Sequence, residues 1–147
     1  MSRKTARNAA MQLIFENLAG GQGGEETLQM VYEQMREEAI ANDQEPTKKD
    51  RLYIATLLEG VLGSLDDLDD LIGSASRGWT VDRMPKVDLT IMRLGTWEIL
   101  HRDENTPGAV IIHEAVELAN QYGEEESGRF INGVLGTILR TQEDQDK

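Results

Sequence analysis

One segment sets the architecture of this chain: Val87-Asp88-Leu89-Thr90-Ile91-Met92-Arg93-Leu94-Gly95-Thr96-Trp97-Glu98-Ile99-Leu100-His101. Wound as a helix, it carries apolar side chains around nearly its whole circumference rather than along one stripe. A helix that is apolar on all sides has to be surrounded by other elements. We therefore expect residues 87–101 to form a central helix in the carboxy-terminal half of the chain.

Helices with a single apolar face are predicted on both sides of this segment. Apolar residues recur at helical spacing, and the alternation typical of β-strands is absent. The breaks between helices contain glycine or proline, as at Pro46, Pro107 and Gly123. The sequence predicts an all-α protein of about seven helices, over residues 3–18, 25–41, 47–71 with a bend at 60–64, 87–101, 107–122 and 124–140.

The longest irregular stretch, residues 73–85, indicates where the chain divides. We expect one domain over residues 1–147, with an amino-terminal helical half at 1–76 and a carboxy-terminal half at 77–140. Residues 141–147 are polar and are expected to form a tail without regular structure.

Charge is distributed unevenly. The formal net charge is -12, which argues against broad, non-specific binding of nucleic acid. The first fifteen residues nevertheless hold Arg3, Lys4 and Arg7 and no acid. At the start of a helix these cations oppose the helix dipole, so they are candidates for binding phosphate. The alternative is a solubilising chain end.

Catalytic and metal-binding motifs are missing. His101 and His113 lack the spacing of a zinc site, and there is no cysteine. The serines lie in no nucleophile elbow, and the aspartates at 66–70 lack the pattern of a calcium loop. No apolar run reaches the ~20 residues of a membrane span. We expect a cytoplasmic protein that is not an enzyme and needs no cofactor or metal.

Trp79, in the irregular stretch 77–88, has two interpretations. It either packs into the core as a plug at the interface between the two halves or offers an exposed platform on which an unpaired base stacks. The residue pattern favours core packing and leaves the platform open.

Several ordered motifs resemble the NusB family. The start of the chain, Ser2-Arg3-Lys4-Thr5-Ala6-Arg7, is similar to that family's start. The longer motifs are GWTVDRMPKVD at 78–88, IMRL at 91–94, WEIL at 97–100, VIIHEAVELA at 110–119, YG at 122–123 and RFINGVL at 129–135. The resemblance implies an all-helical fold of two packed three-helix-type bundles, in agreement with the periodicity.

The resemblance also implies a function. NusB proteins are transcription antitermination factors that bind boxA RNA of ribosomal RNA leader transcripts together with NusE, a small-subunit ribosomal protein. The complex then joins the antitermination complex on RNA polymerase. Two other functions stay open: an auxiliary RNA-binding domain related to ribosomal RNA methyltransferases, and a protein-only adaptor for a basic partner. The oligomeric state stays open too, a homodimer included.

Site residues follow from the resemblance by position. Cations would hold phosphates, and an aromatic ring would stack on an unpaired base. Carboxylates would meet the basic ribosomal protein. The implied RNA-binding residues are Arg3, Lys4, Arg7, Arg77, Trp79, Glu126, Ser127, Arg129 and Phe130, and the implied NusE-binding residues are Phe15, Asp82 and Asp88. So few cations predict recognition shared with NusE rather than tight binding by this protein alone.

Overall fold

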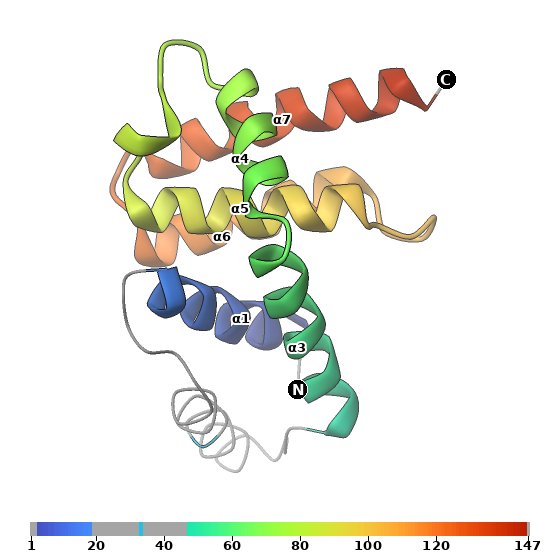
Figure 1. Ribbon diagram of the computed structural model, residues 1–147. Coiled ribbons are helices and arrows are strands. Elements are labelled where there is room, and N and C mark those ends of the chain that lie inside the picture. Colours follow the sequence, from blue (N-terminus) through green and yellow to red (C-terminus); the bar gives the residue numbers. More distant parts are fainter. Residues whose placement is uncertain (1–2, 19–32, 34–46, 147) are drawn as a thin grey trace. The chain divides into compact units, whose positions relative to one another are not determined.

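A computed structural model describes residues 3–18, 33 and 47–146 of the chain (Figure 1). Within those residues the regular structure is α-helical apart from one short 3-10 turn, which confirms the all-α prediction. The helix expected over residues 25–41 lies outside the described residues. The chain forms two compact units, Met1–Leu62 and Gly63–Lys147, and each is treated separately below.

The first unit contains α1 (Arg3–Leu18) and α3 (Lys48–Leu62), which pack against each other. Thr47 and Asp50 form a capping box at the start of α3. The Thr47 backbone N–H donates to an Asp50 carboxylate oxygen at 2.8 Å, and the Asp50 N–H donates to the Thr47 hydroxyl at 3.1 Å. The hydrogen bond from the Thr47 backbone lowers the pKa of Asp50.

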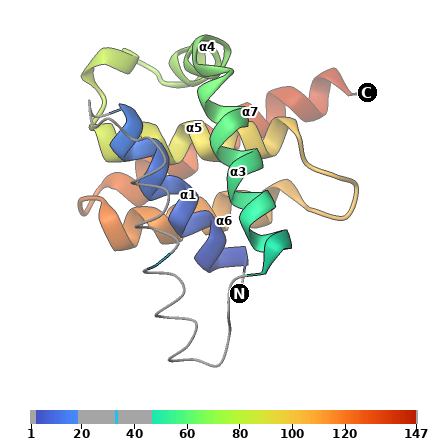
Figure 2. The ribbon, with the colours of Figure 1, turned by 60° about the horizontal axis from the view of Figure 1, so that its bottom comes forward.

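The second unit contains four α-helices and a 3-10 turn: α4 (Leu65–Ala75), η1 (Val81–Arg83), α5 (Lys86–Leu100), α6 (Gly108–Tyr122) and α7 (Ser127–Gln145). Helix α5 contacts α4, α6 and α7, and ten of its residues are buried. This confirms the prediction of a central helix. Helices α6 and α7 lie side by side in both ribbon views, joined by a short turn (Figures 1 and 2).

The boundary between the units differs from the expected one at residue 76. It falls at Leu62 and Gly63, where the predicted bend is a complete break between α3 and α4. Helix α4 packs on α5 and α7 and therefore belongs to the second unit. The guanidinium of Arg93 on α5 donates two hydrogen bonds of 2.7 Å to the carboxylate of Asp69 on α4. One of the aspartates at 66–70 is thus a structural partner of the central helix.

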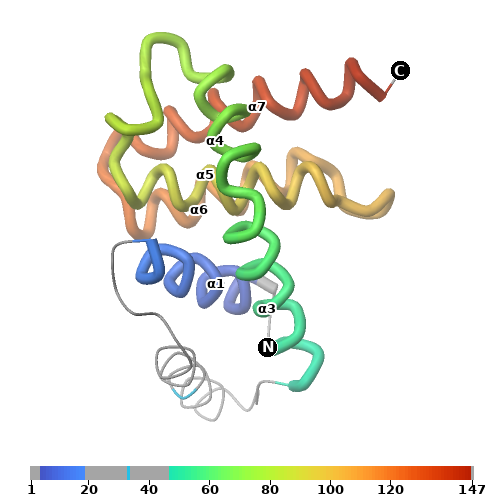
Figure 3. Tube along the Cα trace, in the orientation of Figure 1, coloured from blue at the N-terminus to red at the C-terminus, as the bar shows by residue number. Residues whose placement is uncertain are grey.

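Helix α7 differs from the prediction at both ends. It continues to Gln145, five residues past Arg140, and the tube view shows it running unbroken almost to the chain end (Figure 3). The hydroxyl of Thr141 donates to the carbonyl of Thr137 within this helix at 3.0 Å. At the other end the helix begins at Ser127, so the acids 124–126 form the turn before it.

Candidate RNA and partner site

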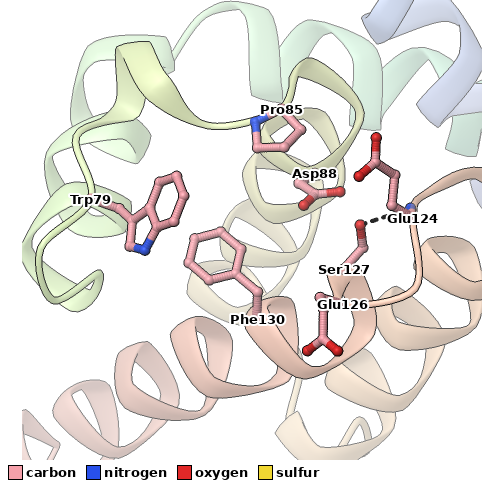
Figure 4. Close-up of a pocket in the computed structure, with 7 residues that line it drawn as sticks. All are labelled: Trp79, Pro85, Asp88, Glu124, Glu126, Ser127 and Phe130. Atoms are coloured by element: carbon pink, nitrogen blue, oxygen red, sulfur yellow. Dashed lines mark hydrogen bonds between the residues drawn. The ribbon is translucent and has the colours of Figure 1, made fainter.

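A hollow of about 180 Å³ lies where the turn before α7 meets the start of α5 (Figure 4). It lies wholly within the second unit. The residues that line it come from the stretch leading into α5, from α5 itself, from the turn before α7 and from the start of α7. They are Trp79, Pro85, Asp88, Glu124, Glu126, Ser127 and Phe130.

Two aromatic rings form one wall of the hollow. The ring centroids of Trp79 and Phe130 are 5.9 Å apart, and the ring planes are tilted by 55°. Trp79 is 51% exposed, so the core-packing interpretation is wrong. Gly78 precedes it with φ of 79°, a backbone conformation that glycine adopts without strain. The chain therefore turns sharply just before the tryptophan, and the ring stays accessible next to Phe130.

Ser127 lines the hollow between the turn before α7 and the start of α5 (Figure 4). Its hydroxyl oxygen accepts a hydrogen bond of 2.9 Å from the Glu124 backbone N–H, and the hydroxyl lies near the Asp88 carboxylate (Figure 4). Gly123 makes this arrangement possible, because a Cβ atom there would lie 2.7 Å from the serine oxygen. Ser127 is buried with its hydroxyl engaged. The structure gives it a positioning role, and its predicted contact with RNA stays a prediction.

Asp88 is a buried carboxylate at the first turn of α5. Burial raises its pKa, because removal from water disfavours the charged form. The hydrogen bond from Ser127 acts in the opposite direction, and the negative charge of Glu124 raises the pKa further. Asp88 is thus a buried carboxylate whose pKa depends on the groups around it, Ser127 and Glu124 among them.

The hollow combines aromatic faces with hydrogen-bond acceptors. Three carboxylates line it, and no lysine or arginine is among its lining residues in the described part of the chain. A phosphate group would be repelled there. A nucleobase fits better, because it can stack on Trp79 and Phe130 while its amino and imino groups donate to Glu126 or Glu124. The cationic side chain of a protein would also be attracted.

Five predicted residues from two different predicted surfaces meet in this hollow. Trp79, Glu126, Ser127 and Phe130 were assigned to RNA, and Asp88 to the protein partner. Pro85 and Glu124 also line it and were missed. The signal for Glu124 was its place directly after Gly123, where a tight turn brings the next residues back towards the preceding helix.

The remaining predicted residues of this unit lie on its surface. Arg77 and Asp82 are exposed, the first in the turn after α4 and the second in η1. Arg129 is exposed on α7 next to Phe130, and lines a groove between α6 and α7 rather than the hollow.

The predicted residues of the first unit all lie on α1. Arg3 is the first residue of the helix, Lys4 is exposed and Phe15 is half-buried. Arg7 is 8% exposed, and its guanidinium makes a long hydrogen bond of 3.5 Å to the Tyr53 hydroxyl on α3. Arg7 therefore takes part in the packing of α1 on α3, which the charge pattern alone did not reveal.

No group of three or more histidine, aspartate or glutamate side chains among the described residues is arranged to hold a metal ion. None of the helices in that part of the chain has the length and apolar character needed to cross a membrane.

A family model and individual known proteins both match this chain, and they point to the same family. A model described as the NusB family matches residues 4–140. The chain is 40% identical over 137 residues to the transcription antitermination protein NusB of Streptomyces avermitilis, covering 93% of this chain and 90% of that protein. It is 39% identical over 145 residues to the protein of the same name from Acetivibrio thermocellus, covering 97% and 91%.

Solved structures agree with the sequence comparison. The fold matches T. maritima NusB with a TM-score of 0.76 and 28% identity, covering 100% of this chain and 99% of that one. It also matches a chain from a crystal structure of the antitermination factors NusB and NusE in complex with double-stranded RNA. That match has a TM-score of 0.73 and 23% identity, covers 95% and 96%, and shows a shared fold.

Proposed function

The chain belongs to the NusB family of transcription antitermination proteins, and we propose that it binds boxA RNA of ribosomal RNA leader transcripts together with NusE. In this proposal it acts in the cytoplasm, as a non-catalytic component of the antitermination complex on RNA polymerase. The observation that carries the proposal is the hollow with Trp79 and Phe130 on one wall and carboxylates on the others.

The hollow would receive an unpaired base of the RNA. Trp79 and Phe130 supply faces for stacking, which contributes about 1–3 kcal/mol per base. Glu126 is exposed at the rim and accepts hydrogen bonds from an exocyclic amino group, as carboxylates do when they recognise cytosine. Because every base has a flat face but the bases differ in their donors, the aromatic wall gives affinity and the carboxylates give selectivity.

Phosphates would be held outside the hollow. Arg77 and Arg129 are exposed in the second unit, and Lys4 is exposed in the first, where Arg3 begins α1. Arg7 would have to serve both its packing contact with Tyr53 and the RNA. For this reason Lys4 is the cleaner residue for testing the amino-terminal contact.

NusE would bind through acidic and aromatic residues. Asp82 is exposed in η1, Asp88 lines the hollow and Phe15 is half-buried on α1. Carboxylates on a protein of net charge -12 complement a basic ribosomal protein and would speed its association. The similar chain crystallised with NusE and double-stranded RNA makes these the partners to test first.

The experiment is a titration of boxA RNA against the protein with and without NusE, read by fluorescence anisotropy. We expect binding that is much tighter with NusE present. Phe130→Ala and Trp79→Ala should each weaken RNA binding by about 1–3 kcal/mol through lost stacking. Lys4→Ala should weaken binding by a smaller amount and lessen its salt dependence.

Matched variants separate stacking from general damage. Phe130→Leu keeps an apolar side chain of similar size but has no aromatic face, whereas Trp79→Phe keeps one. RNA affinity should fall with the first and be largely retained with the second. NusE binding with no effect on RNA binding would instead identify a protein-only adaptor, and equal affinities for all four aromatic-site variants and the wild type would reject the base site.

A further inference from the structure

A second concave surface follows the seam between α6 and α7. This groove has a volume of about 560 Å³ and lies wholly within the second unit. Its floor contains the small residues Ala109, Gly128 and Gly136, and Arg129 and Arg140 lie along it on α7. None of the motifs discussed above assigns a function to Arg140 or to the groove as a whole.

The two arginines form a line of positive charge on one helix face. They are eleven residues apart, which places them about 16 Å apart along the axis and within about 20° around it. No hydrogen bond or ion pair of Arg129 is found among the described residues, and Arg140 donates a 3.2 Å hydrogen bond to the Thr137 hydroxyl on its own helix. Arg93, in contrast, is bound to Asp69. Both groove arginines are exposed and available to an anion.

His113 also lines the groove but is not counted among these cations. Its Nε2 lies 3.4 Å from a carboxylate oxygen of Glu117 one turn along α6, so any positive charge there already has a partner. The cationic line therefore depends on α7.

The groove begins next to the hollow. Arg129 and Phe130 are consecutive residues of α7, and they face the groove and the hollow respectively. The three carboxylates of the hollow repel phosphate, whereas the groove attracts it. An RNA strand with one base against Phe130 is thus directed to place its backbone on the Arg129 side.

From this arrangement we propose that the α6–α7 groove holds the sugar-phosphate backbone of the RNA segment adjoining the base stacked at Phe130, with Arg129 and Arg140 contacting its phosphates. The proposal rests on the proposed function and extends the RNA path by the length of the groove. Gly136 has no side chain to obstruct the strand, and Ala109 on the α6 side is small and exposed. Two phosphate contacts on single-stranded RNA add about −1.4 to the log–log salt slope.

The test compares two RNAs in the presence of NusE. One RNA contains boxA alone. The other carries a short unstructured extension, placed at the 5′ end in one version and at the 3′ end in a second. We expect one extension to tighten binding to the wild type. Arg140→Gln should remove that gain, about two- to fivefold at low salt, and reduce the salt slope for the extended RNA by about 0.7. Binding of the short RNA should not change, and Arg140→Lys should keep most of the gain.

Two further variants control for charge and folding. Arg83→Gln removes the same charge from an exposed arginine of the same unit that does not line the groove, and it should leave the gain intact. Gly136→Glu introduces a carboxylate into the groove and replaces glycine with a better helix former, so it should fold and abolish the gain.

The outcomes distinguish the groove from the base site. Failure of the short RNA to bind overturns the proposed function and the groove proposal with it. If the short RNA binds and depends on Phe130, but neither extension adds affinity, the groove proposal alone is overturned. The groove proposal is also overturned if Arg83→Gln loses as much of the affinity gain from the extension as Arg140→Gln does. A glutamate-rich peptide that binds in an Arg140-dependent manner, without any gain for RNA, would assign the groove to an acidic protein instead.

Discussion

Two of the predicted RNA-binding residues have structural contacts in this protein. Ser127 accepts a hydrogen bond from the Glu124 backbone, and the guanidinium of Arg7 contacts the Tyr53 hydroxyl. Each has the residue type that binds RNA in the family pattern, but each is buried. Substitutions at these positions therefore change folding and binding together, whereas Trp79 and Lys4 report on binding more directly because they are exposed.

Asp88 provides a prediction for stability as a function of pH. Burial raises its pKa in the folded state, so the folded protein takes up this proton at a higher pH than the unfolded chain does. The aspartate therefore disfavours folding at neutral pH, and that penalty disappears as the pH falls below the unfolded value of about 3.9. Asp88→Asn should leave the free energy of unfolding at pH 7 unchanged or higher, and its advantage over the wild type should shrink towards pH 4.

Urea denaturation at a series of pH values measures this difference. Asp82→Asn is the control, because Asp82 is exposed and should show no such trend. An Asp88→Asn variant that is strongly destabilised at pH 7 would contradict the electrostatic assignment. NusE affinity, measured on the same protein, should fall with Asp88→Asn if the carboxylate meets a basic residue of that partner.

At the scale of elements, two local features fix where helices begin and how closely they pack. The capping box of Thr47 and Asp50 supplies hydrogen bonds that the first turn of α3 cannot make internally. Gly95 lies where α5 contacts α7, and a Cβ atom there would come within 2.9 Å of the Leu135 side chain. The first feature is local in sequence and the second is not.

Loss of the capping box should destabilise the protein. Thr47→Ala is expected to cost about 1 kcal/mol in the free energy of unfolding. The lowered pKa of Asp50 means that its contribution is present above the unfolded value and is lost as the pH falls through the folded one. The difference between wild type and Asp50→Asn, measured by thermal denaturation, should therefore be largest near neutral pH and vanish in strong acid. Thr56→Ala, within the same helix, is a control away from the cap.

A larger side chain at Gly95 should disturb the α5–α7 contact. Gly95→Val is expected to cost about 1–3 kcal/mol, because Leu135 is fully buried and has little room to move. Gly133→Ala is the matched control on α7, since a Cβ atom there meets nothing within 4 Å. That variant should be neutral or stabilising by up to about 1 kcal/mol. Equal stability of Gly95→Val and the wild type would show that the two helices can separate at no cost.

At the scale of the whole molecule, the net charge of -12 confines RNA to a few cationic positions. About three amino-terminal phosphate contacts predict a slope of log affinity against log salt near −2, at ~0.7 per contact on a single strand. The groove arginines would bring the slope for a longer RNA to about −3.5 by the same measure. Titrations at several salt concentrations test this, and a slope near zero would contradict phosphate binding at either position.

Much of the fold was accessible from the sequence because helices are coded locally. The apolar periodicity of 87–101 gave the central helix, and Thr47 with Asp50 gave the start of α3. The division between Leu62 and Gly63 was not expected, because the apolar stripe of α4 does not reveal which neighbours that helix packs against. The end of α7 was placed too early because polar residues continue a helix as readily as they end one.

What the sequence by itself determined was the all-α class, the central helix, the family and the residue types of the candidate site. Periodicity, capping residues and motifs each involve residues close together along the chain, so they can be recognised in the sequence alone. Only the tertiary structure decided that Trp79 is exposed beside Phe130, that Asp88 and Ser127 line the same hollow, and that Arg129 and Arg140 line a groove. These facts depend on how separate helices pack, and packing joins residues far apart in the sequence.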